Sequence, residues 1–169
     1  MEVKSGGLPV RELVLYALLG TVMFALKMAM AGLPNIEPVS LLVIVYTLTF
    51  RGRAFWPILL YVVLEFLTWG VNLWTINYLY VWAILSLLTH LFRGMDSILG
   101  WAVLSGAFGL CFGLLCVPVY WLTGGWAFAL SWWVSGIPFD LLHCAGNFFI
   151  ALALFRPCRR ILETLKSTY

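Results

Sequence analysis

Charged residues are nearly absent from the long apolar runs that make up most of this chain. Only 10% of the 169 residues are Asp, Glu, Lys or Arg, 63% are hydrophobic, and the mean hydropathy is +1.01. A soluble domain keeps roughly a quarter of its residues charged, so this composition predicts that lipid is the solvent. A bilayer-spanning helix needs about 20 apolar residues. Six such helices with short turns use nearly the whole chain and leave no room for a soluble catalytic domain.

The apolar runs predict an all-α membrane protein with six transmembrane helices in one domain, residues 1–169. We expect the spans at about 12–31, 36–50, 55–71, 78–92, 97–119 and 137–155. The segment from Tyr120 to Trp133, between the fifth and sixth spans, is aromatic and punctuated by polar residues, which favours an interfacial or re-entrant piece. The first run follows Glu2 and Lys4 without an A-x-A cleavage site, which indicates a retained span rather than a signal peptide.

Basic residues fall on one side of this six-span topology. They are Lys4, Arg11, Arg51, Arg53, Arg93, Arg156, Arg159, Arg160 and Lys166. The opposite loops, around 32–36, 72–77 and 120–136, contain no Lys or Arg, and Lys27 lies inside the first span. Lys and Arg are enriched in cytoplasmic loops. The distribution therefore predicts that both termini are cytoplasmic.

The opposite, non-cytoplasmic side combines aromatic residues with acids and amides. The candidates there are Asn35, Glu37, Trp69, Asn72, Trp74, Tyr78, Tyr120, Trp126, Trp132, Trp133 and Asp140. An aromatic belt at the lipid headgroups explains part of this enrichment. It does not explain why acids and amides gather there without a base. A pocket with aromatic walls and a few polar groups accounts for the remainder.

Two short segments on that side share one pattern of Gly, Pro and a carboxylate. The first runs from Gly32 to Glu37 and the second from Gly136 to Asp140. We expect each to open a helix, because Pro is tolerated at a helix start and the helix dipole favours an acid there. The carboxylates either serve only those helix starts or contact a ligand, since an acid at membrane depth is costly.

Asp140, His143 and Asn147 follow at spacings of three and four, so they share one face of the last span. This stripe is either a hydrogen-bonded packing face or a binding face, and its start at the outer mouth favours binding. His143 and Cys144 alone are too sparse for a metal site. The four cysteines show no CxxC pairing, so we expect no metal, cofactor or disulfide framework.

Lys27 and Glu65 lie near the middle of the first and third predicted spans. An unpaired charge at that depth costs several kcal/mol, so we predict an ion pair between them. Ala25 and Ala29 stand four residues apart on the first span. A small-xxx-small pattern of this kind allows two helices to approach closely in lipid.

Two stretches of the sequence resemble the S components of energy-coupling factor (ECF) transporters. Residues 25–40, ALKMAMAGLPNIEPVS, are similar to the first helix and following loop of that family, and residues 136–149, GIPFDLLHCAGNFF, to its last helix. Size, six spans and topology also agree, so the resemblance covers essentially the whole chain. It implies a high-affinity binding subunit for a vitamin or other micronutrient in a prokaryotic cytoplasmic membrane.

The resemblance also implies partners. An Ala-x-x-x-Ala motif, here Ala25 and Ala29, would dock the transmembrane coupling subunit (T component), and two ATPase subunits would supply power. The ligand would sit near the outer surface, among the aromatic and acidic residues. An acid-rich mouth without a base argues against a strongly anionic cargo, and a cobalamin-like, uncharged-to-cationic cargo is the first expectation.

Two other functions compete with this one. The first is a membrane assembly or interaction protein without a ligand, in which the aromatic residues form only a belt. The second is an intramembrane enzyme that uses His143 and Asp140, but no GxSxG, HExxH or Walker motif occurs, so we do not expect an enzyme. We expect no nucleic-acid partner. Aromatic side chains that converge on a cavity would favour the binding subunit, and side chains that all face lipid would favour the assembly protein.

Overall fold

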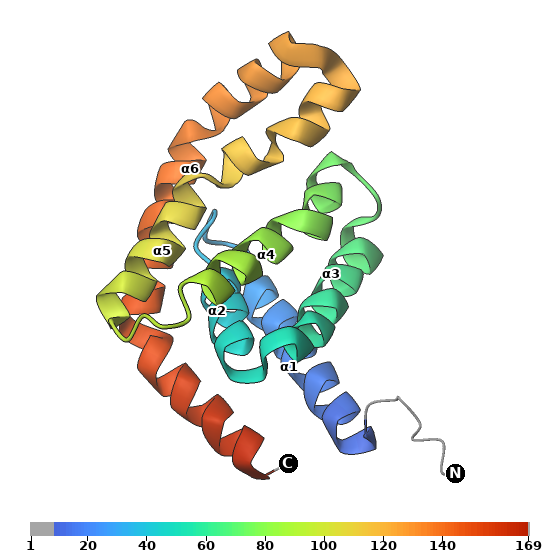
Figure 1. Cartoon of the computed structure of the whole chain (residues 1–169). Coiled ribbons are helices and arrows are strands. Elements are labelled where there is room, and N and C mark those ends of the chain that lie inside the picture. Colours follow the sequence, from blue (N-terminus) through green and yellow to red (C-terminus); the bar gives the residue numbers. More distant parts are fainter. Residues whose placement is uncertain (1–8, 169) are drawn as a thin grey trace.

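The computed structural model describes residues 9–168, and these residues form helices and turns without a strand (Figure 1). Glu2 and Lys4 lie outside the described residues. The elements are α1 (Val10–Ala29), α2 (Val39–Phe50), the 3₁₀ helix η1 (Arg51–Ala54), α3 (Phe55–Trp69), α4 (Leu73–Leu91), α5 (Ile98–Leu110) and α6 (Phe112–Thr168).

Three helical stretches within residues 9–168 are long and apolar enough to cross a membrane. They are Val10–Ala29, Val39–Trp69 and Ile98–Thr168. The structure therefore fits the expected all-α membrane protein, and by length and composition it has three such stretches where six spans were predicted. The second and third predicted spans form one stretch that turns at η1, and the fifth and sixth predicted spans belong to one long stretch. The predicted fourth span, α4, is not among the three.

Two helix starts differ from the predicted positions. Helix α2 begins at Val39 rather than 36, because Pro38 occupies its N-cap position and Asn35 has a positive φ of 56°. Helix α4 begins at Leu73, five residues before the predicted start at 78. The Asn72 side chain accepts hydrogen bonds from the backbone N–H groups of Trp74 (2.9 Å) and Thr75 (3.1 Å), and the Thr75 hydroxyl accepts one from the Asn72 N–H (3.0 Å). This capping box satisfies N–H groups that a helix start leaves unpaired.

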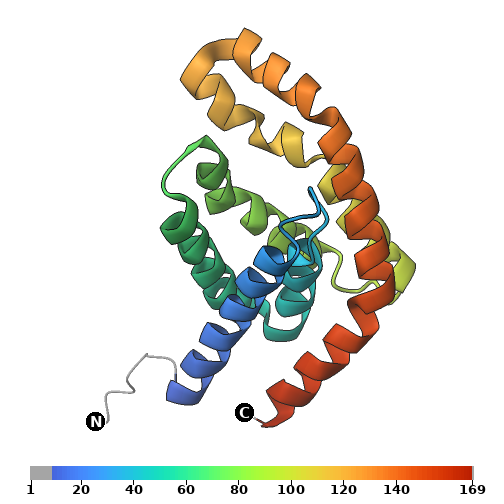
Figure 2. The same cartoon turned by 180° about the vertical axis from the view of Figure 1, so that it is seen from behind.

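The aromatic segment from Tyr120 to Trp133 is helical, and the interfacial or re-entrant piece predicted there is the tip of a helical hairpin. Helix α6 reverses direction at Gly125, whose φ of 77° and ψ of 178° are non-helical (Figures 1 and 2). We call residues 112–124 the first limb of α6 and residues 126–168 the second limb. The Tyr120 ring stacks on Trp132 across the hairpin at 3.7 Å between centroids.

The second limb of α6 runs without a break through the segment that was expected to open the sixth span. Pro138 lies inside the helix, and Gly136 to Asp140 are helical throughout. The helix also continues past Arg156 and Pro157 to Thr168, well beyond the predicted end at 155. The predicted helix start at Gly136 is therefore wrong.

Helix α2 forms the centre of the bundle. Every one of its residues except Leu48 is buried, as expected for a helix that is apolar on all sides. The second limb of α6 packs closely on α5, because Gly109 of α5 has no side chain. A Cβ at Gly109 would lie 2.7 Å from the carbonyl oxygen of His143. This close approach positions His143 toward the interior of the bundle.

Candidate ligand-binding site

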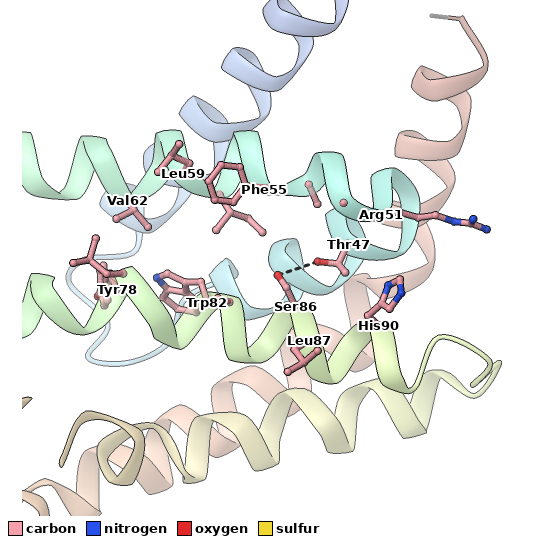
Figure 3. A pocket seen from close by; sticks show the side chains of 15 residues that line it. Thr47, Arg51, Phe55, Leu59, Val62, Tyr78, Trp82, Ser86, Leu87 and His90 are labelled. Carbon is pink, nitrogen blue, oxygen red and sulfur yellow. Dashed lines mark hydrogen bonds between the residues drawn. The ribbon is translucent and has the colours of Figure 1, made fainter. Parts of the chain in front are cut away.

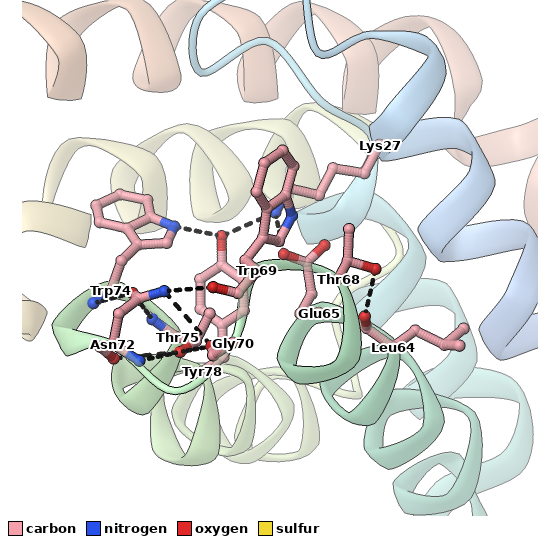
Figure 4. Close-up of polar contacts among 10 residues, drawn as sticks. All are labelled: Lys27, Leu64, Glu65, Thr68, Trp69, Gly70, Asn72, Trp74, Thr75 and Tyr78. Atoms are coloured by element: carbon pink, nitrogen blue, oxygen red, sulfur yellow. Dashed lines mark hydrogen bonds and ion pairs between the residues drawn. The ribbon is translucent and has the colours of Figure 1, made fainter.

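A cavity of about 370 Å³ lies where the end of α1, residues 30–38, α3, α4 and α6 meet. We call it the inner cavity. Its charged, aromatic and imidazole walls are Lys27, Glu37, Glu65, Trp69, Trp74, Tyr78, Phe112 and His143. Figure 4 shows that five of these lining residues, Trp69, Trp74, Tyr78, Lys27 and Glu65, lie close together.

Lys27 and Glu65 form the ion pair expected from the sequence, and it belongs to the cavity wall. The Lys27 Nζ lies 2.6 Å from Glu65 Oε2 and donates a second hydrogen bond of 3.1 Å to the Tyr78 hydroxyl. The indole N–H of Trp74 donates to the same hydroxyl at 2.9 Å. The two charges are not at mid-span as predicted. Lys27 lies in the last turn of α1, and Glu65 lies one turn before the end of α3 at Trp69.

Glu37 adds a second carboxylate to this cavity. It lies two residues before α2, not in the first helical turn as predicted, and its side chain is half-buried. Burial raises the pKa of the Glu37 carboxyl to about 7; the charge of Lys27 lowers it and that of Glu65 raises it. A carboxyl whose charge is disfavoured in this way gains most from a cation or a hydrogen-bond donor at the same place.

His143 presents an imidazole to the cavity that the protein leaves without a partner. The ring is 3% exposed and packs edge-on against Phe112, with 5.0 Å between ring centroids. Neither ring nitrogen has a hydrogen-bond partner among residues 9–168, and Glu65 Oε1 has none either. Buried polar groups are almost always hydrogen-bonded. These atoms are therefore the ones that a polar ligand would satisfy.

A second cavity, of about 330 Å³, adjoins the first and is called the hairpin cavity. Both are lined by Asn35, Trp74 and Phe112, and the second one adds Trp132 and Asp140 among others. The Asn35 side-chain amide donates to the carbonyl oxygen of Phe139 at 3.1 Å. This bond joins the two Gly–Pro segments that were noted for their similar sequence.

The polar stripe on the second limb of α6 has three different roles. Asp140 Oδ1 accepts the backbone N–H of Gly113 at 3.0 Å, and thus satisfies a donor that the start of α6 leaves free. His143 faces the inner cavity. Asn147 donates to the Ser40 hydroxyl at 3.0 Å and to the carbonyl of Ser105 at 3.3 Å, so it joins helices rather than facing a cavity.

The predicted binding residues divide into two groups. Those that line one or both cavities are Asn35, Glu37, Trp69, Trp74, Tyr78, Trp132, Asp140 and His143. Those that line neither cavity are Asn72, Tyr120, Trp126, Trp133 and Asn147. Asn72 caps α4, and Trp126 is 67% exposed and stacks on Trp121 at 5.2 Å. The aromatic residues are thus partly cavity walls, and of those outside the cavities Trp126 is exposed whereas Tyr120 is buried.

Some cavity residues were missed by the sequence analysis. Phe112, Met28 and Met30 line the inner cavity, but their apolar side chains could not be told from ordinary core residues. The mouth was also predicted to be free of bases, whereas Lys27 lies in it. Lys27 is close to Glu37 in the sequence, and this closeness was the signal that could have placed both residues at one cavity.

Comparisons of the chain with protein-family models, curated proteins and solved structures find no match. Within residues 9–168, no group of three or more His, Cys, Asp or Glu side chains is placed to hold a metal ion. The site therefore has to be interpreted from its own geometry.

Proposed function

We propose that this chain is the high-affinity substrate-binding subunit, or S component, of an ECF-type importer for a vitamin or related micronutrient. The observation that carries the proposal is the inner cavity. An ion pair, a second carboxylate and an unpartnered histidine converge there between indole and phenol rings. An aromatic belt alone gives no reason for these polar groups to face a common space.

The proposal includes six membrane crossings with both termini in the cytoplasm of a prokaryotic cell. Helices α1 to α4, α5 with the adjoining first limb of α6, and the second limb of α6 are the six crossing segments. The start of α1 and the end of α6 lie at the same end of the molecule (Figure 1). Arg51 and Arg93 lie at opposite ends of α2 and α4 from Glu37 and Trp74. Basic residues mark the cytoplasmic side, so the two cavities would open to the outside.

The lining of the cavities indicates the chemistry of the cargo. Trp74, Tyr78 and Trp132 suit a flat ring, because aromatic rings stack or pack edge-on with favourable energy. Glu37 and Glu65 against the single ammonium of Lys27 favour a neutral or cationic ligand. Volumes of about 370 and 330 Å³ are typical of sites for compact small molecules. They favour a smaller cargo than the cobalamin-like one that the sequence suggested.

The proposed partners bind at a different surface. Ala25 and Ala29 are exposed on α1, so a helix of the transmembrane coupling subunit could approach them closely. Two ATPase subunits would act through that coupling subunit. This chain would bind the cargo and return it unchanged.

A matched pair of tryptophan variants tests the proposal. We expect the melting temperature of the full chain in detergent to rise with at least one compound from a panel of water-soluble vitamins and their ring precursors. Trp74→Leu removes an indole that lines both cavities, and we expect it to abolish that rise. Trp121→Leu removes an indole of similar exposure, 43% against 37%, that lines neither cavity, and we expect it to preserve the rise. No rise with any compound would favour the membrane assembly protein.

A further inference from the structure

A third cavity lies on the flank of the bundle, toward the opposite end from the candidate site. It is an apolar groove of about 330 Å³ between α3 and α4, with Phe55, Leu59 and Val62 on one wall and Trp82 and Leu87 on the other (Figure 3). Phe55 and Leu87 are 57% and 69% exposed, so the groove opens on the outer surface of the bundle.

The few hydroxyl groups in this groove are satisfied within the protein. Thr47 donates to the Ser86 hydroxyl at 3.2 Å (Figure 3). The indole N–H of Trp82 is the one side-chain donor of this groove that is buried without a partner among residues 9–168. The other walls between Phe55 and Leu87 are mostly apolar, so the groove on the flank of a membrane protein suits a hydrocarbon chain better than a polar ligand that would lose its hydration there.

The groove leads into a basic cavity of about 470 Å³. Thr47, Arg51 and His90 line both, and the basic cavity adds Arg93 and Arg159. Arg51 comes from η1, Arg93 from the turn after α4 and Arg159 from the second limb of α6, while His90 lies at the end of α4. Three arginines from separate parts of the chain therefore converge at the mouth of an apolar groove.

Two of these arginines carry charges that the protein does not neutralise. Among residues 9–168, neither Arg51 nor Arg93 lies within salt-bridge distance of a carboxylate, whereas Arg159 pairs with Glu163 at 2.8 Å through its Nε. Arg53, two residues after Arg51, pairs with Glu12 instead and lines neither cavity. The basic cavity thus holds two guanidinium charges that no carboxylate of residues 9–168 neutralises.

The backbone at Arg51 supports the same interpretation. Its φ of 55° is positive, a conformation that costs a non-glycine residue about 1–3 kcal/mol and tends to persist at functional positions. Gly52 follows directly and would adopt a positive φ without that cost. The strained conformation instead falls on the arginine that lines both cavities.

We propose that these two cavities together bind one anionic phospholipid, with an acyl chain in the α3–α4 groove and the phosphate among Arg51, Arg93 and Arg159. Guanidinium groups recognise phosphate oxygens through paired hydrogen bonds. The site is separate from both cavities at the other end, although Tyr78 contributes to the far end of the groove and to the inner cavity. It does not depend on the identity of the cargo or on the importer function.

Native mass spectrometry of the full chain in detergent tests this proposal, with phosphatidylglycerol and phosphatidylcholine of identical acyl chains as probes. We expect one phosphatidylglycerol to bind at least about fivefold more tightly than phosphatidylcholine, and each arginine removed to reduce its affinity about fivefold. Glycerol phosphate, which has the phosphate but no acyl chains, should not compete at equal concentration. Equal binding of the two lipids, or effective competition by glycerol phosphate, would overturn the proposal.

Variants locate the binding. Arg51→Gln combined with Arg159→Gln should remove most of the preference for phosphatidylglycerol. Arg11→Gln removes one charge from an exposed residue that lines neither the groove nor the basic cavity and should preserve the preference. Arg51→Gln alone is the variant with the matching change of one charge, and it should lower the preference. Ala83→Phe fills the groove without changing any charge and should weaken both lipids. An equal loss in Arg11→Gln would show diffuse attraction to the basic surface and would contradict a defined site. The wild-type comparison of lipids decides the outcome if a variant fails to fold.

Discussion

The ammonium of Lys27 lies 2.6 Å from Glu65 Oε2 and also donates to the Tyr78 hydroxyl, so an ion pair between α1 and α3 forms part of the wall of the inner cavity. Glu65 is fully buried. Its second oxygen has no partner among residues 9–168. The pair therefore joins α1 to α3 and leaves one acceptor oxygen of Glu65 without a partner at the wall of the inner cavity.

Removal of one partner of this pair should be costly. Lys27→Met leaves the Glu65 carboxylate buried without a counter-charge, and we expect a loss of about 3–5 kcal/mol in the free energy of unfolding. Adding Glu65→Gln removes that uncompensated charge, so the double variant should be more stable than the sum of the single losses predicts. Chemical unfolding in detergent gives the free energy of unfolding of the wild type, Lys27→Met, Glu65→Gln and the double variant. Additive losses in the two single variants would contradict a direct pair.

Glu37 should make stability depend on pH. Its pKa is raised from 4.5 in the unfolded chain to about 7 in the fold, so the folded state binds more protons between these values. Stability from this group is therefore present at pH 4.5 and falls as the pH rises to 7, by up to about 3 kcal/mol. Glu37→Gln should remove this fall, and the variant should gain stability over the wild type at pH 8 relative to pH 5. Parallel stability curves for the two proteins would contradict the burial of Glu37.

Two glycine substitutions should have opposite effects. A Cβ at Gly109 would lie 2.7 Å from the His143 carbonyl oxygen, so Gly109→Ala should push α5 away from α6 and cost about 1–3 kcal/mol. Nothing lies within 4 Å of a Cβ at Gly136, which is inside α6. Gly136→Ala should therefore stabilise the protein by about 0.5–1 kcal/mol through helix propensity. Melting temperatures of both variants in one detergent check the contrast.

Assembly and ligand binding should be separable. Ala25→Trp or Ala29→Trp places a large ring on the exposed face of α1, and we expect it to prevent co-purification with the coupling subunit while the vitamin-induced melting shift remains. Trp74→Leu should abolish the vitamin-induced melting shift and leave co-purification with the coupling subunit intact. Co-purification of each variant with tagged coupling subunit, together with its melting shift, checks both readouts. If all three variants lose the same readout, docking of the coupling subunit and ligand binding do not use separate faces of the protein.

Part of this architecture was predictable from the sequence, and the failures have physical causes. The Lys27–Glu65 pair followed from the cost of an unpaired charge in lipid, and the gathering of Trp74, Tyr78 and Glu37 followed from the charge asymmetry. The start of α4 was missed because hydropathy was given more weight than the cap that Asn72 provides.

The other errors concern proline and glycine. The sequence predicts a helix start at Pro138, but α6 continues through it because close packing on α5 outweighs the loss of one backbone hydrogen bond. The sequence could not show whether the chain reverses at Gly124 or at Gly125, since only the folded backbone shows which of them has a positive φ. Asp140 was expected to support its own helix start, yet it accepts the N–H of Gly113 from the first limb of the hairpin.

The most direct measurement of the central claim is native mass spectrometry of the full chain purified in mild detergent from cells grown in rich medium. The account predicts a one-to-one complex with a small, neutral or cationic ring compound that is retained by Trp121→Leu and lost from Trp74→Leu. A bare chain in the wild type, with no complex formed after a vitamin panel is added, would contradict the binding function. It would leave the cavity walls as part of an assembly protein.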